Sequence, residues 1–290
     1  MSERNSTNES VQELTSWARA QLEDLTDTPS LDAQLLMMRV LGVPRAWVLA
    51  HPEATLQPQQ LEEFKSYVRR CAEGTALPYV IGRWEFFGRP FHVTPDVLIP
   101  RPETEHLVQV ALGALARRED LRRVLEVGTG SGCVVVTLAL EMEGRDYYAS
   151  DISRPALDVA SKNAREYRAQ EQIDFVQADL LRGLRGPFDF VAANLPYIAS
   201  DRLQTLKVGK REPDLALDGG QDGLEPLRSF VGPLRRSLRP GGELVLELDP
   251  EQMEAAESIL GDAIPLDHVQ VFDDLSGRAR VLHVRRDPET

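Results

Sequence analysis

The chain has few cysteines, no long hydrophobic run and no excess of basic residues. Two cysteines, Cys71 and Cys133, among 290 residues cannot form a disulfide framework or a cysteine-based zinc site. Uninterrupted apolar stretches such as Cys133–Val136 are far short of the ~20 residues that a membrane helix needs. Residues 1–10 are polar and contain no apolar core, so we expect no secretory signal. These absences predict a cytoplasmic protein with no membrane partner.

Basic side chains are outnumbered throughout the sequence. Lys and Arg total 33 against 46 Asp and Glu, which gives a net charge of −13 and a pI near 4.9. A protein that binds duplex nucleic acid usually presents basic residues that displace counterions from the phosphates. Acidic residues exceed basic ones both before and after Glu85, and no basic segment is set apart. The composition therefore disfavours nucleic acid as a partner.

The first part of the chain has a helical pattern. Apolar residues recur at spacings of three and four in three segments, namely Val11–Leu25, Ser30–Leu41 and Gln57–Cys71. Two segments rich in β-branched and aromatic residues follow, Tyr79–Phe86 and Arg89–Val93, and Gly88 between them indicates a hairpin. We expect a small helical domain over residues 1–77, a linking β-hairpin over 78–95 and a larger domain over 96–290.

The larger domain alternates apolar strands with amphipathic helices. Strands are expected at Arg123–Val127, Tyr147–Ser150, Ile173–Gln177, Phe188–Ala193 and Glu243–Leu248. Helices are expected at Cys133–Glu141, Arg154–Arg168, Leu224–Leu238 and Glu251–Leu260. Such alternation predicts an α/β fold, with a doubly wound and mostly parallel sheet. The last two segments, Val269–Phe272 and Ala279–Val284, have a short connection, which predicts a terminal antiparallel hairpin.

A glycine-rich turn follows the first of these strands. The segment Gly128–Gly132 reads Gly-Thr-Gly-Ser-Gly and opens a helix, and glycine allows a backbone to approach a ligand closely. It fails the dinucleotide pattern G-x-G-x-x-G because position 133 is Cys, and it lacks the Lys of a phosphate-binding loop. The turn therefore predicts a nucleoside ligand without a pyrophosphate, while a tight turn with no ligand would have the same local pattern.

Two aspartates at the ends of the next strands favour the nucleoside. Asp151 follows the second strand, 19 positions after Gly132, near the ~20 expected of a ribose-binding carboxylate. Asp179 follows the third strand, and we expect it to contact an adenine edge. The residues that we expect to bind the cofactor are Glu126, Gly128, Thr129, Gly130, Gly132, Asp151, Asp179 and Asn194.

The fourth strand runs into Asn194-Leu195-Pro196-Tyr197, which resembles the Asn-Pro-Pro-Tyr motif of methyltransferases that modify planar, amide-like nitrogens. An amide nitrogen is a poor nucleophile because its lone pair is delocalised into the carbonyl. We expect the Asn194 side-chain oxygen and a backbone carbonyl of the motif to accept its N–H groups and orient it. Tyr197 would supply an aromatic wall. These four residues are the expected catalytic and substrate-binding residues, although a turn at a strand end would also use Asn and Pro.

Other segments resemble the HemK/PrmC family, which methylates the side-chain amide nitrogen of a glutamine in peptide chain release factors. They are Val97–Glu105, Glu212–Pro213, Ala216–Leu224 and Asp274–Arg278, together with the glycine turn. The resemblance covers nearly the whole chain and implies a class I S-adenosylmethionine-dependent methyltransferase preceded by a helical substrate-recognition domain. It differs at Leu195, where the family motif has its first proline.

The resemblance implies S-adenosylmethionine as cofactor and the glutamine of a Gly-Gly-Gln motif in release factors as substrate. A glutamine of a large-subunit ribosomal protein is the nearest alternative, and an exocyclic amine of a nucleic acid base is a further one. A non-catalytic S-adenosylmethionine-binding scaffold is an alternative of another class. No two of the five histidines have a metal-binding spacing, so we expect no metal site. We also expect a monomer.

Overall fold

The computed structural model describes residues 9–206 and 211–289, and the chain divides into two compact units. The first unit ends at Gly82 and the second begins at Arg83. The hairpin that follows Gly82 belongs to the second unit, and its role as a link between domains stays a prediction. The segment of the predicted helical domain over residues 1–8 lies outside the described residues. Within the described ranges, no helix is both long and apolar enough to cross a membrane.

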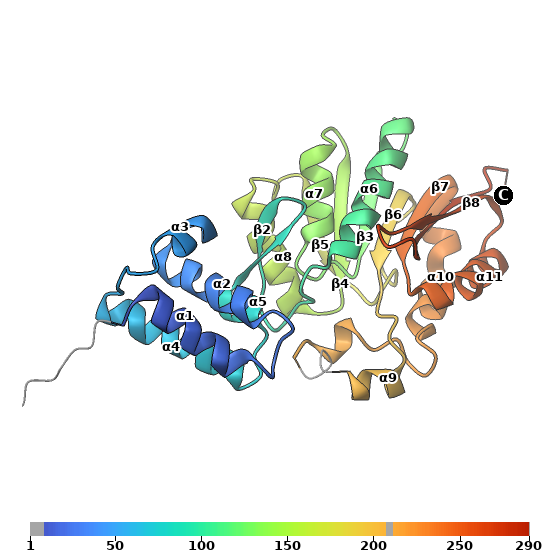
Figure 1. Ribbon diagram of the computed structural model, residues 1–290. Helices are drawn as coiled ribbons and strands as arrows, with labels where there is room; N and C mark the ends of the chain where they lie inside the picture. The colour runs from blue at the N-terminus through green and yellow to red at the C-terminus, as the bar shows by residue number, and fades with distance from the viewer. Residues whose placement is uncertain (1–8, 207–210, 290) are drawn as a thin grey trace, which may run out of the picture. The chain divides into compact units, whose positions relative to one another are not determined.

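The described part of the first unit is helical, as the sequence predicts (Figure 1). Its helices are α1 (Val11–Leu22), α2 (Pro29–Leu41), α3 (Arg45–Ala50), α4 (Pro58–Ala72) and α5 (Leu77–Ile81). Ser10 begins α1 because its hydroxyl accepts the Glu13 N–H at 3.2 Å, and the Glu13 carboxylate accepts the Ser10 N–H at 2.8 Å. Leu14, Leu36 and Phe64 are fully buried in the core of this unit.

The prediction of a strand beginning at Tyr79 is wrong. Residues up to Ile81 form α5, because Pro78 suits a first helical turn and Gly82 ends the helix at a φ of +77°. The hairpin itself is shorter than predicted, with β1 at Arg83–Phe86 and β2 at Arg89–His92. The periodicity also extended the first helix too far, since α1 ends at Leu22.

The second unit contains a seven-stranded sheet in the order β5-β4-β3-β6-β7-β9-β8. Its strands are β3 (Arg123–Val127), β4 (Asp146–Asp151), β5 (Ile173–Gln177), β6 (Phe188–Asn194), β7 (Leu238–Glu247), β8 (Leu266–Asp273) and β9 (Ala279–Arg286). The first five are parallel, whereas β9 is antiparallel to both β7 and β8. The predicted doubly wound sheet with a terminal antiparallel hairpin is therefore confirmed.

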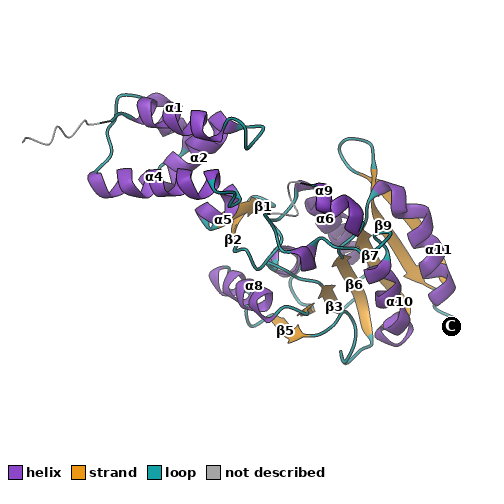
Figure 2. Ribbon diagram, turned by 90° about the horizontal axis from the view of Figure 1, so that it is seen from below, coloured by secondary structure: helices purple, strands orange, loops and turns teal. Residues whose placement is uncertain are grey.

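Helices cover both faces of this sheet (Figures 1 and 2). Along β3, Val124 joins the core under α6 (Pro102–Arg117), α7 (Cys133–Glu141) and α8 (Arg154–Glu166), whereas Leu125 joins the core under α10 (Glu225–Ser237) and α11 (Met253–Ala263). This alternation follows from the opposite directions of successive side chains in a strand. Short helices lie in the connections, at α9 (Ser200–Thr205), η2 (Asp214–Ala216) and η3 (Pro250–Gln252).

The carboxyl ends of the parallel strands meet at one edge of the sheet. Val127 pairs with Ser150 on one side and with Ala193 on the other, and Asn194 is in register with Glu247. The loops that follow β3, β4 and β6 therefore begin side by side. In open α/β sheets this edge is where ligands bind.

Candidate active site

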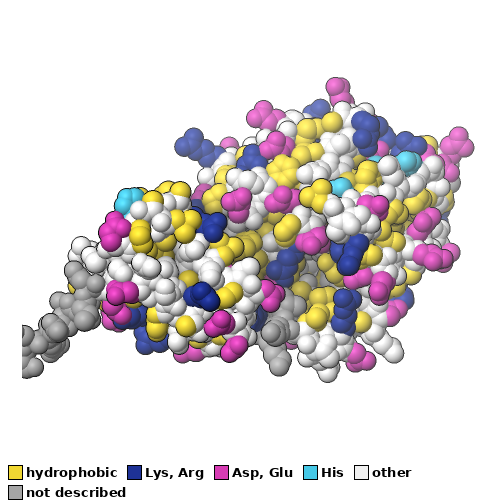
Figure 3. Space-filling model, in the orientation of Figure 1, with side chains coloured by type: hydrophobic (Ala, Val, Ile, Leu, Met, Phe, Trp, Pro, Cys, Tyr) yellow, Lys and Arg dark blue, Asp and Glu magenta, His cyan; other side chains and the backbone are white. Residues whose placement is uncertain are grey.

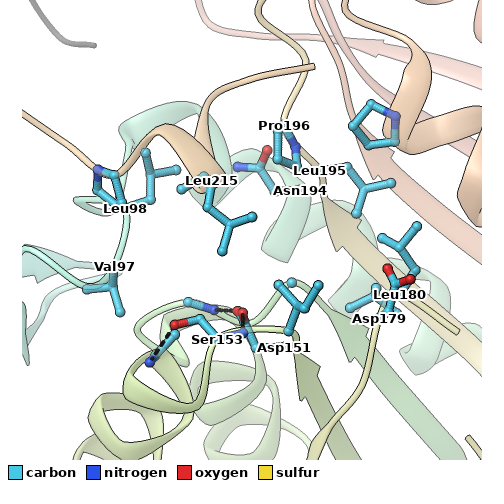
Figure 4. A pocket seen from close by; sticks show the side chains of 18 of the residues that line it. Val97, Leu98, Asp151, Ser153, Asp179, Leu180, Asn194, Leu195, Pro196 and Leu215 are labelled. Carbon is cyan, nitrogen blue, oxygen red and sulfur yellow. Dashed lines mark hydrogen bonds between the residues drawn. The ribbon is translucent and has the colours of Figure 1, made fainter. Parts of the chain in front are cut away.

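A cavity of about 530 Å³ opens at this edge of the sheet. Its volume lies within the range of roughly 300–1,000 Å³ of small-molecule sites. Seven of the predicted site residues line it, namely Gly128, Gly130, Asp151, Asp179, Asn194, Leu195 and Pro196. Figure 4 shows Asn194 and Pro196 across the cavity from Asp151 and Ser153. The structure therefore brings the predicted nucleoside residues and most of the predicted reaction motif together.

Asp151 is held by the backbone around it. Its Oδ2 accepts the Gly130 N–H and its Oδ1 accepts the Ser153 N–H, both at 2.9 Å. Burial raises the pKa of Asp151, and the backbone donors oppose that rise. Each carboxylate oxygen has two lone pairs, so each can accept one further hydrogen bond from a ligand. This arrangement fits the two hydroxyls of a ribose.

The glycine turn leaves space for a ligand on one side and packs tightly on the other. Gly130 has a φ of +53°, and a Cβ there would meet no atom within 4 Å. Gly132 has a φ of +77°, and a Cβ there would lie 2.9 Å from Cβ of Ala160 in α8. Gly130 therefore leaves space beside the backbone for a ligand, and Gly132 permits close packing of the turn on α8. Both features fit a nucleoside-containing cofactor such as S-adenosylmethionine.

Asp179 is a partly exposed residue of the cavity lining. Its Oδ2 accepts a hydrogen bond from Arg182 Nη1 at 2.7 Å, and both residues line the cavity. Leu180 between them has a φ of +53° and also lines the cavity (Figure 4). The apolar side chain of Leu180 and the polar pair can together contact a flat base and its edge.

Four predicted site residues are not among the described residues that line the cavity: Glu126, Thr129, Gly132 and Tyr197. The Glu126 carboxylate is buried and accepts hydrogen bonds from the Thr129 hydroxyl at 2.5 Å and the Val135 N–H at 3.0 Å. It therefore ties the glycine turn to α7. Burial raises the pKa of Glu126 to about 8, and the two hydrogen bonds oppose that rise.

Asn194 is anchored by its amide nitrogen. Asn194 Nδ2 donates to the hydroxyl oxygen of Thr104 in α6 at 3.1 Å. The side-chain oxygen of Asn194 is the other end of the same planar group, and it is the end that an amide substrate would need as an acceptor. The hydrogen bond to Thr104 therefore engages the nitrogen end of this amide and fixes the plane of the group.

Tyr197 turns toward a buried carboxyl group. Its hydroxyl donates to Glu247 Oε1 at 3.4 Å, and Glu247 is only 1% exposed. Burial raises the pKa of Glu247 to about 7. Burial also raises the pKa of Tyr197, and the neighbouring carboxylate adds to that rise. Tyr197 is therefore a neutral hydrogen-bond donor at physiological pH.

Three of the segments that carry the family resemblance, Val97–Glu105, Glu212–Pro213 and Ala216–Leu224, contact the reaction motif or each other. A Cβ at Gly223 would lie 2.3 Å from the Tyr197 carbonyl oxygen, so a glycine is required there. The Glu212 carboxylate is buried, accepts the Ile99 N–H at 3.0 Å and forms an ion pair with Arg101. These contacts fix the loops on either side of the cavity.

Sequence reasoning gave no role to Thr104, Glu212 or Glu247. Thr104 and Glu212 lie in the segments quoted for the resemblance, but their partners are 90 and 113 residues away. Glu247 is the last residue of β7 and directly follows three apolar residues, Leu244 to Leu246. A charged residue at the buried carboxyl end of a parallel strand was the available signal, because such residues rarely lie inside without a partner.

Two family models match parts of this chain. The PrmC N-terminal domain matches residues 13–82, and a methyltransferase domain matches residues 124–210. A methyltransferase structure from Pyrococcus furiosus aligns with a TM-score of 0.51 at 16% identity, over 77% of this chain and 99% of that chain. The predicted class I methyltransferase fold is therefore confirmed, and S-adenosylmethionine is the cofactor of such a domain.

Curated relatives match over almost the full length. A release factor glutamine methyltransferase of Nitratidesulfovibrio vulgaris is 36% identical over 99% of this chain and 98% of the relative. Another, from Chlorobaculum tepidum, is 38% identical over 87% of this chain and 88% of the relative. The resemblance drawn from the motifs is confirmed, and the chain belongs to the family of release factor glutamine methyltransferases, which are S-adenosylmethionine-dependent enzymes.

Proposed function

We propose that this enzyme methylates the side-chain amide nitrogen of the glutamine in the Gly-Gly-Gln motif of peptide chain release factors. The observation that carries the proposal is the orientation of Asn194, whose Nδ2 is engaged by Thr104 while the residue lines the same cavity as Asp151. A glutamine amide has two N–H donors, and the Asn194 side-chain oxygen can accept one of them. The names of the relatives supply the class of substrate.

The residues of this chain would act by binding and orientation. S-adenosylmethionine supplies an electrophilic methyl group on a positively charged sulfur. Asp151 and the glycine turn would hold its nucleoside, and Asp179 with Leu180 would contact its base. Asn194 and a carbonyl of the motif would accept the two amide N–H groups of the substrate. These acceptors favour the positive charge that develops on nitrogen, and they hold the nucleophile in line.

Leu195 can replace the proline of the family motif without loss of the clamp. The residue before a proline is restricted to extended backbone, and Pro196 imposes this on Leu195. Leu195 is 6% exposed and its side chain joins the core under α10, so packing fixes it as well. We therefore propose that its carbonyl keeps the direction that the substrate amide requires.

The acidic composition supports a protein substrate over a nucleic acid. On the face seen in Figure 3, Lys and Arg side chains are interspersed with Asp and Glu and form no continuous basic stripe. A release factor and a ribosomal protein can be compared as substrates in the same methylation assay. The test is incubation of the purified protein with labelled S-adenosylmethionine and purified release factor, followed by mass mapping of the product. We expect one methyl group on the Gly-Gly-Gln glutamine, and methylation only of a ribosomal protein or of RNA would refute the proposal.

A further inference from the structure

We propose that Glu247, acting through the hydroxyl of Thr104, is a positioning residue that keeps the oxygen of the Asn194 side chain turned toward the substrate amide. The inference deepens the proposed function and rests on it, because orientation of this amide matters only if an N–H donor binds there. The three residues come from β7, α6 and β6.

The fold places these three side chains on the same face of the sheet. Asn194 and Glu247 are direct neighbours in the parallel register of β6 and β7, so their side chains point the same way. That face is the one covered by α6, where Thr104 lies in the first turn and is 4% exposed. The group is therefore shielded from solvent on the side away from the cavity.

The direction of the hydrogen bonds follows from the number of protons on Thr104. Its oxygen accepts from Asn194 Nδ2 at 3.1 Å, and its single hydroxyl proton is then left for a different acceptor. Of the groups that interact with Glu247, the Thr104 hydroxyl does most to favour the charged form of its carboxyl group. Among the described residues, Glu247 Oε2 is a buried oxygen with no hydrogen-bond partner, so it is the acceptor that we infer for the Thr104 proton.

An ionised carboxylate can only accept hydrogen bonds, and this property fixes the direction of the hydrogen bonds that link Asn194, Thr104 and Glu247. In this arrangement Glu247 accepts from Thr104, Thr104 accepts from Asn194 Nδ2, and the Asn194 side-chain oxygen is left to accept from the substrate. A protonated Glu247 can instead donate to Thr104. The Thr104 hydroxyl could then donate to the Asn194 oxygen, and the amide would present its NH₂ group to the NH₂ group of the substrate. Two donors facing each other cannot bind.

Charged and titratable groups from several elements face Glu247. Arg280 of β9 favours its charged form, whereas Glu103 of α6 disfavours it, and the Tyr197 hydroxyl donates to Oε1. Cys133 at the start of α7 is close enough to interact electrostatically with this carboxylate. Its thiol is neutral, because burial raises its pKa. With these neighbours, the pKa of Glu247 is about 7. Protonation of Glu247 near neutral pH would therefore reverse the direction of the hydrogen bonds that link Glu247, Thr104 and Asn194.

The direct test observes the Asn194 amide in the free protein. In ¹⁵N-labelled protein, the Asn194 Nδ2 resonance is assigned by its loss in Asn194→Ala. We expect it to shift with pH through neutrality in the wild type and to remain constant in Glu247→Gln, which has the same shape and no titration. A resonance that does not titrate in the wild type, or that titrates equally in Glu247→Gln, would overturn the inference whatever the substrate is.

The kinetic test uses a matched pair at Thr104. Thr104→Val keeps the shape and removes the hydroxyl, whereas Thr104→Ser keeps the hydroxyl. We expect Thr104→Val to lower kcat for the release factor at least tenfold or so, by analogy with loss of a preorganised catalytic hydrogen-bond partner. Thr104→Ser should have a kcat within about threefold of the wild type, which is less than the tenfold change expected for Thr104→Val. The affinity for S-adenosylmethionine should be unchanged in both variants.

The pH profile separates this role from simple packing. In the wild type, kcat should rise with pH through about 7, and in Glu247→Gln this limb should be absent. Equal kcat in Thr104→Val and the wild type would refute the inference. Failure of the wild type to methylate a release factor would refute the proposed function instead, and the Asn194 resonance would still decide whether Glu247 controls the amide.

Discussion

Replacement of Asp151 by Asn should weaken the binding of S-adenosylmethionine by about one to two orders of magnitude. The side chain keeps its size, but the charge is lost and an NH₂ group replaces one oxygen. That NH₂ group must face either the Gly130 or the Ser153 N–H, which the carboxylate now accepts at 2.9 Å. Hydrogen bonds to a charged group contribute about 1.5–3 kcal/mol. Loss of the charge-assisted hydrogen bonds to the ribose therefore corresponds to roughly a 10- to 150-fold increase in Kd.

Titration calorimetry with S-adenosylmethionine measures this change, and Asp179→Asn is the matched control. Asp179 is partly exposed and already paired with Arg182 at 2.7 Å, so its loss should weaken binding by less than about 1 kcal/mol. Burial raises the pKa of Asp151, so its charge does not stabilise the free fold, and the Tm without ligand should fall by only a few degrees at most. Binding to Asp151→Asn within twofold of the wild type, or a larger loss in Asp179→Asn, would refute the assignment of the ribose site.

Four further changes test other parts of the site. Asn194→Ala should raise the barrier for methyl transfer by about 2.7–4 kcal/mol with cofactor affinity retained, and a nearly unchanged kcat at saturating release factor would refute the amide clamp. Leu195→Pro should change that barrier by no more than about 1 kcal/mol, the scale of proline's entropic effect, because Pro196 already restricts the backbone; the same kinetic assay checks it. In the wild type, ionisation of Glu126 should lower the free energy of unfolding by up to about 1.4 kcal/mol per pH unit, and Glu126→Gln should abolish this pH dependence. In the wild type that loss arises as pH rises from 4.5 to about 8, since the unfolded chain releases this proton first; a pH series of unfolding measurements with parallel curves for both proteins would contradict it. Gly223→Ala places a Cβ 2.3 Å from the Tyr197 oxygen at a φ of +78° and should destabilise the second unit by at least 1 kcal/mol or so, measured as a lower urea midpoint; an unchanged midpoint would exclude the steric conflict.

The strand ends could be predicted because parallel sheets impose a simple pattern. Buried parallel strands are short apolar runs, and the predicted bounds of Arg123–Val127 and Ile173–Gln177 are those of β3 and β5. The polar residues that follow such runs must lie at one edge, which is why Asp151 and Asn194 line the same cavity. The error at Tyr79 has the opposite cause. Tyr79 and Val80 have strand propensity, but Pro78 and Gly82 begin and end a one-turn helix there.

The side-chain contacts within the site could not be read from local patterns. Tyr197 is next to Pro196 in sequence, yet its ring leaves the cavity because Glu247, 50 residues later, offers a buried acceptor. Glu126 has the position of a cofactor ligand, but its carboxylate turns away to Thr129 and Val135. In both cases a buried polar group takes the partner that satisfies it, and that choice depends on the packed sheet rather than on spacing along the chain.

Three of the segments that carry the family resemblance hold the reaction motif and the loops beside it in place, although most of their residues do not line the cavity. Gly223 allows its backbone to contact the Tyr197 carbonyl, Glu212 holds the loop before α6 by a backbone hydrogen bond and an ion pair, and Thr104 binds the Asn194 amide. Methyl transfer to an amide depends on orientation, because the nucleophile is weak and no strong base is needed. A motif of four residues at a strand end cannot supply that orientation alone. If Asn194 orients the substrate amide as we propose, these three segments are as necessary for catalysis as Asn194, since each restricts the positions that the motif can take.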